Sequence, residues 1–353
     1  MGLYVGNELV IKNGDIIVSA ASSTGIGTTE NKKITASDAA SSDQFGYSVA
    51  VGSGRIVVGA YYNNVTYNNQ GSAYIFDLDG NEVGILTASI GQTNQYFGNS
   101  VAVGSGKIVI GSRGFSSAKG AAYIYDLDGT NENRITASDG AAYDQFGRSV
   151  AVGCGKVVVG SYDDDVNSNT DQGSAYIYDL DGTNEIKITA SDAAGFDRFG
   201  NSVAVGCGRI VVGSSLDDDN GNVSGSAYIF DLNGNQLTKI TASDGDSSDY
   251  FGYSVAVGSG RIVVGAPYDN DNGSDSGSAY IFDLDGNQLS KITASDGAVS
   301  DLFGYSVAAG SGRIVVGAYL DDDNGSSSGS AYIFNLSEDS NTYWERILET
   351  YKY

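Results

Sequence analysis

The chain has 353 residues, with 43 Asp or Glu against 19 Lys or Arg, so its formal net charge is −24. Proteins bind the phosphates of nucleic acids with basic surfaces, so we expect no nucleic-acid partner for so acidic a chain. No stretch approaches the roughly 18 apolar residues of a membrane-spanning helix, and we expect no membrane insertion.

One repeat of about 50 residues covers the whole chain. Its clearest feature is the dipeptide Phe-Gly. A degenerate copy, with Val5-Gly6 in place of Phe-Gly, lies near the N-terminus. The seven copies start near residues 5, 45, 97, 146, 199, 251 and 303. Because the repeat leaves no room for a second kind of domain, we expect a single domain over 1–353, with a shortened first copy.

Each copy reads as four short strands. In the sixth copy, β-branched or apolar runs cover 253–257, 261–264, 279–282 and 290–294. Asp285-Gly286 supplies the positive φ angles of a tight hairpin between the last two runs. Four antiparallel strands per unit, repeated seven times, predict an all-β, seven-bladed β-propeller. A right-handed solenoid is the alternative.

The same copy resembles a known family. Phe251-Gly252, Gly265-Ala266-Pro267 and the run Gly-Ser-Ala-Tyr-Ile-Phe at 277–282 resemble the FG-GAP repeat. This resemblance implies a propeller like that of integrin α-subunits and of many bacterial and phage surface proteins. Integrin-like repeats carry a calcium loop between the first two strands. Here that place holds only Gly258-Ser259-Gly260, which is too short to surround a calcium ion.

The turns and loops fall on two faces of the expected propeller. The short-turn face carries a base at the start of the second strand in six copies and an acid at the end of the third strand in five, which predicts exposed cross-strand ion pairs. The bases are Arg55, Lys107, Lys156, Arg209, Arg261 and Arg313, and the acids are Asp77, Asp126, Asp179, Asp231 and Asp283. The long-loop face varies from copy to copy, so we expect function there.

Carboxylates gather in the long loops. Five copies place Asp two residues before Phe-Gly, and the later copies add acidic clusters beside glycine. Oxygen ligands of this kind suit calcium, which is the only cofactor that the sequence suggests. The candidate ligands are Asp163, Asp165, Asp217, Asp219, Asp269, Asp271, Asp321 and Asp323. The alternative is a solvated acidic loop whose aspartates cap turns.

Two copies replace this acidic pattern with aromatic residues. Tyr and Arg are enriched at binding hot spots, so we predict a ligand-binding patch there. Its members are Tyr61, Tyr62, Tyr67, Arg113 and Phe115. The alternative is unconstrained variation in exposed loops. The C-terminal segment 341–353 is also aromatic, and we expect it either to complete the last blade or to dock on a partner.

Catalytic constellations are not evident. The chain has no His, which removes the commonest acid–base catalyst and metal ligand. Cys154 and Cys207 stand at matching positions of neighbouring copies, too far apart for a disulfide, so we expect two free thiols. The exposed carboxylates lack an environment that would separate their pKa values, so we expect no enzyme.

These observations favour a non-enzymatic binding or structural module. The first residues, Met1 to Glu8, lack a basic segment and a long apolar run, so we expect no secretory signal. We therefore expect a virion-associated propeller, in a phage tail, fibre or capsid decoration, that uses its long-loop face for adhesion or assembly. The alternative is a bacterial cell-surface or secreted adhesin or lectin. The expected partners are virion proteins, cell-surface proteins or glycans, and the expected location is a virion or the cell exterior.

Overall fold

The computed structural model describes residues 32–323 and 325–336, together with the backbone of four short strands nearer the N-terminus. The chain divides into two compact units, 1–34 and 35–353. In the first unit, β1 (Tyr4–Val5) pairs antiparallel with β2 (Glu8–Leu9), and β3 (Ile11–Lys12) pairs with β4 (Asp15–Ile16). The aromatic segment 341–353 lies outside the described residues.

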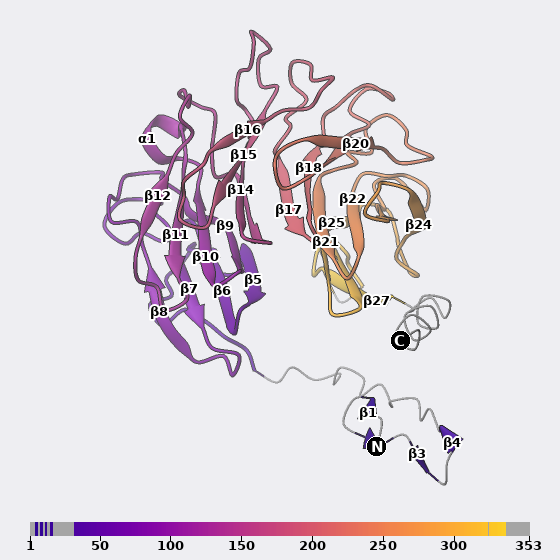
Figure 1. The fold of residues 1–353 in the computed structure, drawn as a ribbon, viewed down its shortest axis with the longest axis horizontal. Helices are drawn as coiled ribbons and strands as arrows, with labels where there is room; N and C mark the ends of the chain where they lie inside the picture. Colours follow the sequence, from indigo (N-terminus) through magenta and orange to yellow (C-terminus); the bar gives the residue numbers. More distant parts are fainter. Residues whose placement is uncertain are drawn as a thin grey trace, which may run out of the picture. The chain divides into compact units, whose positions relative to one another are not determined.

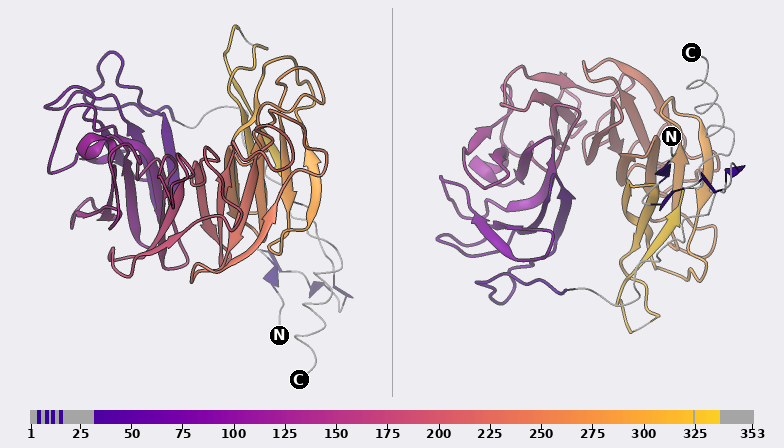
Figure 2. Two further views of the ribbon diagram at one scale, coloured as in Figure 1. Left: turned by 90° about the horizontal axis from the view of Figure 1, so that it is seen from above. Right: turned by 60° about the horizontal axis from the view of Figure 1, so that its bottom comes forward.

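The second unit is built from six consecutive antiparallel meanders, which we call the first to sixth blades (Figures 1 and 2). The first blade contains β5 (Ser48–Gly52), β6 (Arg55–Ala60), β7 (Ser72–Phe76) and β8 (Glu82–Leu86). The second contains β9 (Phe97–Gly104), β10 (Lys107–Ser112), β11 (Ala121–Asp126) and β12 (Asn133–Ile135). The third contains β13 (Ser149–Gly153), β14 (Lys156–Ser161), β15 (Ser174–Asp179) and β16 (Ile186–Ile188). The fourth contains β17 (Ser202–Gly206), β18 (Arg209–Ser214), β19 (Ser226–Phe230) and β20 (Gln236–Ile240). The fifth contains β21 (Ser254–Gly258), β22 (Arg261–Ala266), β23 (Ser278–Phe282) and β24 (Gln288–Ile292). The sixth contains β25 (Phe303–Gly310), β26 (Arg313–Ala318) and β27 (Ser330–Asn335). One short helical turn, α1 (Phe115–Ala118), follows β10.

The four-stranded antiparallel blade is confirmed, but the predicted number of seven blades is wrong. Five blades have four strands, and three strands of the sixth are described. The degenerate first copy forms no such meander in the described residues, where only two two-residue hairpins precede β5. The physical reason lies in its sequence. That copy lacks the Phe-Gly pair and is about twelve residues short, so it cannot supply a full set of strands.

The repeated phenylalanine is the centre of each blade's packing. The innermost strands of successive blades lie side by side, from β5 to β25. Between them, Phe251 is 1% exposed and meets the rings of Tyr280 and Phe282 edge-on, with centroids 5.4 and 5.9 Å away. The cores are apolar on both sides of β22 because each middle strand is covered by two neighbouring blades. This explains the non-alternating apolar run that the sequence contains.

A glycine lets the next blade approach. Gly173 precedes β15 and pairs with Phe199, the first residue of the next Phe-Gly. The Phe199 amide donates to the carbonyl of Gln172 at 2.9 Å. A Cβ on Gly173 would lie 2.1 Å from the Phe199 carbonyl oxygen, and the residue has φ +84°. Only glycine tolerates both the positive φ and the close approach of the Phe199 carbonyl. The same conformation accounts for the Gly that opens every Gly-Ser-Ala-Tyr run.

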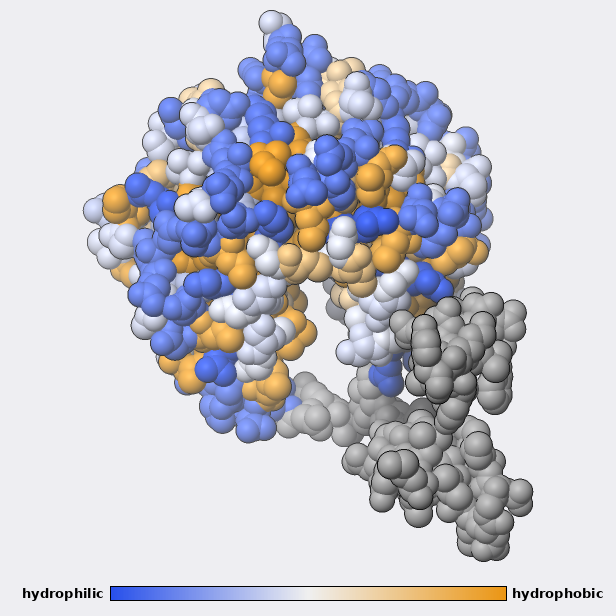
Figure 3. Space-filling view, in the orientation of Figure 1, coloured by the Kyte–Doolittle hydropathy of each residue, from blue (hydrophilic) through white to orange (hydrophobic). Residues whose placement is uncertain are grey.

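The two end blades each keep an apolar face that no described residue covers. On the first blade, Val49 and Val51 are 67% and 72% exposed. On the sixth blade, Ile333 is 50% exposed, whereas Ile229, at the same position of the fourth blade, is fully buried. Among the described residues, β5 and β25 lack the close packing that joins successive inner strands. Elsewhere the surface seen in Figure 3 is mostly hydrophilic, with scattered hydrophobic patches.

The ion pairs predicted for the short-turn face are present in two blades. Lys107 pairs with Asp126 at 2.5 Å, and Lys156 pairs with Asp179 at 2.6 Å, so cross-strand ion pairs are confirmed for the lysine copies. Arg55 makes a different contact, since its Nε donates to the carbonyl of Leu127 in the next blade. Both cysteines are free and exposed, as predicted. None of the helices in the described part of the chain is long and apolar enough to cross a membrane.

Candidate functional site

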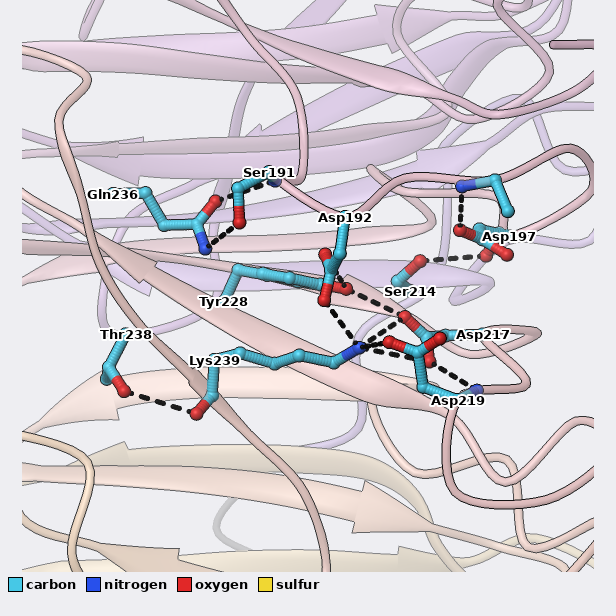
Figure 4. Close-up of polar contacts among 11 residues, drawn as sticks. Ser191, Asp192, Asp197, Ser214, Asp217, Asp219, Tyr228, Gln236, Thr238 and Lys239 are labelled. Atoms are coloured by element: carbon cyan, nitrogen blue, oxygen red, sulfur yellow. Dashed lines mark hydrogen bonds and ion pairs between the residues drawn. The ribbon is translucent and has the colours of Figure 1, made fainter.

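The acidic loops contain a polar cluster that joins two blades, shown for the fourth blade in Figure 4. Lys239 on β20 places its Nζ 2.9 Å from Asp192, 3.0 Å from Asp217 and 2.6 Å from Asp219. The Tyr228 hydroxyl oxygen lies 2.9 Å from Asp192 and 2.7 Å from Asp217, which share its one proton. Asp192 comes from the end of the preceding blade. The cluster therefore ties neighbouring blades together, and we call it the lysine latch.

Electrostatics in the latch favours the charged forms. Burial alone would raise the pKa of Asp192, but bonds from Lys239 and Tyr228 lower it. Burial alone would lower the pKa of Lys239, but its three carboxylate partners raise it. The ammonium group is thus a permanent cation at neutral pH, held inside the acidic loop. It supplies the counter-charge that a metal ion would otherwise provide.

The latch recurs in three successive blades. In the third blade, Lys187 lies 2.6 Å from Asp139 and 2.8 Å from Asp164. In the fifth blade, Lys291 lies between Asp244, Asp269 and Asp271. In the sixth blade, Tyr332 donates to Asp296 and Asp321, each at 2.8 Å.

The first two blades replace the latch with neutral or aromatic contacts. In the first blade, Asn63 stands where the others have a buried Asp, and its amide donates to Tyr74 at 2.9 Å. Ile85 takes the lysine position there. In the second blade, Phe115 takes the aspartate position, and the guanidinium of Arg134 lies 4.7 Å from its ring centroid. The lysine–aspartate pair is absent from both blades, but each keeps one charged member: Asp38 accepts from Tyr74 at 2.6 Å in the first, and Arg134 stands at the lysine position, opposite Tyr123, in the second.

Six of the eight predicted metal ligands fall into two groups, and the other two, Asp165 and Asp323, are exposed. Asp217, Asp219, Asp269 and Asp271 are latch members bound to lysine, and Asp321 accepts from Tyr332. Asp163 lies elsewhere, beside Arg198. Within 32–323 and 325–336, no group of three or more acidic, His or Cys side chains is arranged to hold a metal ion. Asp217, Asp219, Asp269 and Asp271 do not fit calcium, because a lysine ammonium already lies among their carboxylate oxygens.

The lysine latch predicts that calcium is not required for stability. A calcium ion at Asp217 would have to displace the Lys239 ammonium, so we expect 5 mM EDTA and 5 mM CaCl2 to give the same Tm by differential scanning calorimetry. A Tm that rises by several degrees with calcium and falls with EDTA would contradict this expectation. It would favour the calcium site that the sequence suggests.

A second set of aspartates is buried two residues before Phe-Gly in five of the six blades. The Asp197 carboxylate accepts from the amide of Ala194 at 2.6 Å and closes its own turn. Asp249 does the same with Asp246 at 2.7 Å. Burial, together with the acidic loops nearby, raises the pKa of both Asp197 and Asp249 to about 6. These residues shape the loops, as the turn-capping alternative predicted.

The raised pKa values predict how replacing both residues changes the pH dependence of stability. Below about pH 4, both groups are protonated in the folded and unfolded states. As pH rises through 6 they ionise at a cost in the folded state, so their stabilising contribution is lost. We expect Asp197→Asn with Asp249→Asn to raise the free energy of unfolding at pH 7.5 by about 1–2 kcal/mol per site, with the gain vanishing near pH 4. Urea unfolding across this range is the measurement. Asp285→Asn, at an exposed turn, is the control; an equal gain there would contradict the argument.

Aromatic and basic side chains form a belt where the innermost strands meet the long-loop face, which we call the collar. Its members directly flank Phe-Gly or follow the second strand. They are Tyr47, Tyr61, Tyr62, Tyr96, Arg113, Gln145, Arg148, Tyr162, Asp163, Arg198, Tyr250, Tyr253, Tyr268, Tyr305 and Tyr319. The collar residues are held in place by the buried Phe of the adjacent Phe-Gly pairs.

Contacts run along the collar from blade to blade. Tyr61 packs against Tyr47 and Tyr62, and Tyr96 of the second blade lies 6.0 Å from Tyr61. The Arg113 guanidinium stacks over Tyr96 at 5.1 Å. These rings form one cluster across two blades. Burial, with the neighbouring tyrosines, raises the pKa of Tyr61, so its hydroxyl stays protonated.

The remaining blades continue the belt. Tyr162 lies between two guanidiniums, Arg148 at 5.1 Å and Arg198 at 5.2 Å. Tyr253 packs 4.9 Å from Tyr305, which packs 4.5 Å from Tyr319. Flat rings with hydroxyl groups and fixed guanidiniums are suited to holding a ligand rather than to transferring a proton or electron pair.

The predicted ligand patch is divided by the structure. Tyr61, Tyr62 and Arg113 come together in the collar through Tyr96. Phe115 lies apart, under Arg134 in the second blade's version of the latch, and packs against the core. Tyr67 is exposed farther out along its loop. Sequence reasoning missed Arg148, Arg198 and Tyr162, although each stands at a repeat position where its counterparts vary.

These blades and this site define a class, the repeat-built β-propellers. A model of the FG-GAP repeat matches residues 28–76, 81–125, 130–178, 183–230, 235–282 and 287–334. The chain therefore belongs to the FG-GAP repeat family. Comparison with curated proteins gave no match.

Proposed function

We propose that this chain is a non-enzymatic binding module that holds its partner over the collar on the long-loop face. The observation that carries the proposal is the belt of tyrosines and arginines, which are in contact from Tyr47 to Arg198 and again from Tyr253 to Tyr319. Such side chains give large contact areas at a small cost in conformational entropy. The FG-GAP family, whose fold is typically non-catalytic, supports the same conclusion.

We place this module on a virion, in a phage tail, fibre or capsid decoration, where it serves adhesion or assembly. The net charge of −24 suits an environment of high ionic strength, in which self-repulsion is screened. A bacterial cell-surface or secreted adhesin or lectin is the second setting, and it would use the same collar. Recovery of the native protein with purified particles, or with washed cells, separates the two settings.

A pair of matched variants tests the binding surface. The collar variant carries Tyr47→Ala, Tyr162→Ala and Tyr319→Ala. The control carries Val83→Ala, Leu237→Ala and Leu289→Ala, which remove large exposed side chains from fourth strands. Wild type and both variants are applied to intact virus particles, bacterial cells and a printed glycan array, with melting curves to verify folding.

We expect each ligand of the wild type to be retained by the control and lost, at least tenfold in affinity, by the collar variant. Three interface aromatics at about 1 kcal/mol or more each account for that loss. Retention by the collar variant together with loss by the control would contradict the proposal and place the binding surface on the outer strands.

A further inference from the structure

The collar holds an uneven distribution of charge. It carries three arginines, on the second, third and fourth blades, and one aspartate. Arg198 Nε lies 3.2 Å from Asp163. Arg113 reaches only a neutral partner, Gln145, at 3.2 Å. No carboxylate of the described residues pairs with Arg148. The centre of the collar is therefore cationic in a chain whose net charge is −24.

The arginines are also incompletely hydrogen-bonded. The Nε atoms of Arg113 and Arg148 are buried and have no partner among the described residues. A buried donor without an acceptor costs about 1–3 kcal/mol. Stacking on Tyr96 and Tyr162 fixes the guanidinium planes in advance. A stacked guanidinium keeps its N–H edge for a carboxylate or sulfate.

We infer that the collar binds an oligosaccharide that bears an isolated acidic group, which Arg148 and Arg113 hold while tyrosines stack on its sugar rings. This inference rests on the proposed function and adds the chemical class of the ligand. The acidic group can be a carboxylate or a sulfate, since both present oxygens to the same guanidinium edges.

The surroundings of the arginines favour a sugar over an acidic peptide. Asp163 lies within the collar, and Asp165 and Asp218 are exposed on the adjoining loops. Carboxylates accept hydrogen bonds from sugar hydroxyls, but they repel a ligand that carries many negative charges. Tyrosine rings offer flat faces for the C–H groups of a sugar and hydroxyls for its oxygens. A ligand with one acidic group and many hydroxyls fits both features.

The test uses defined probes and the full chain. Sialyllactose, a hyaluronan tetrasaccharide and a sulfated lactose are titrated calorimetrically, with lactose and chitotetraose as neutral counterparts and hexaglutamate as the peptide probe. The variant is Arg148→Gln. The control is Arg261→Gln, the same change at the opposite end of the fifth blade, where the arginine bonds only its own turn.

We expect at least one acidic saccharide to bind ten times more tightly than its neutral counterpart. Arg148→Gln should abolish that preference, and Arg261→Gln should leave it intact. The carboxylate and sulfate probes identify which acidic group is preferred. Equal binding of acidic and neutral sugars, an unchanged preference in Arg148→Gln, binding of hexaglutamate alone, or no saccharide binding would each overturn the inference. The proposed function fails separately, if the collar variant keeps its ligand on particles or cells and the control variant loses it.

Discussion

Replacing Lys239 by methionine should lower the free energy of unfolding by about 3 kcal/mol, because it leaves three clustered carboxylates without their cation. Asp217 is the critical partner, since only 3% of its side chain is exposed and no water can solvate its charge fully. Tyr228 would still donate one hydrogen bond but no charge. Urea unfolding at pH 7.5 measures the change.

Lys156→Met is the matched control for this experiment. It removes the same side chain from a pair with Asp179 that is more exposed, on the short-turn face, where we expect a loss of about 1 kcal/mol or less. Adding Asp217→Asn and Asp219→Asn to Lys239→Met should recover part of the lost stability. Equal small losses in the two lysine variants would show that the latch is only a surface ion pair.

Gly173→Ala should destabilise the protein by about 3–4 kcal/mol. Positive φ at an alanine costs about 1–2 kcal/mol. Overpacking against the Phe199 carbonyl adds a further roughly 1–3 kcal/mol, because that backbone is fixed by the next blade. The expected consequence is a wider gap between the third and fourth blades, with faster amide exchange at Phe199.

Gly155→Ala separates the two contributions. Gly155 has φ +77°, and a Cβ there would meet no atom within 4 Å. We therefore expect a loss of about 1 kcal/mol in this control, from backbone strain alone. Similar Tm values for the two alanine variants would contradict a role for Gly173 in joining the blades.

Much of the fold is predictable from the sequence because the strand and turn pattern of one blade occurs in six copies. The Phe-Gly pair, the tight turns and the apolar second strand have the same meaning in each copy, and the meander follows from them. The blade count was harder to predict, because the spacing near Val5 resembles a copy whose strand-forming residues are missing. A periodic position does not by itself supply the residues that a blade needs.

The latch and the collar were predicted only in part, for two different reasons. Lys239 and Asp192 lie 47 residues apart, so loop spacing alone shows acidic clusters without the cation that pairs with them. Because the loop sequence shows the carboxylates without their lysine, it favours the calcium interpretation. The collar is not evident from the sequence because Arg148 and Arg198 flank the repeated Phe-Gly, whose recurrence the fold already explains. Only the blade-to-blade contacts place them beside Tyr162.

Hydroxyl-radical footprinting with and without the bound partner tests most directly whether the collar is the binding surface. Mass spectrometry reads the oxidation of single tyrosines along the chain. We expect protection at Tyr47, Tyr162 and Tyr319, with unchanged oxidation of Leu237 and Leu289 on the outer strands. Protection of those leucines while the collar tyrosines stay reactive would contradict it.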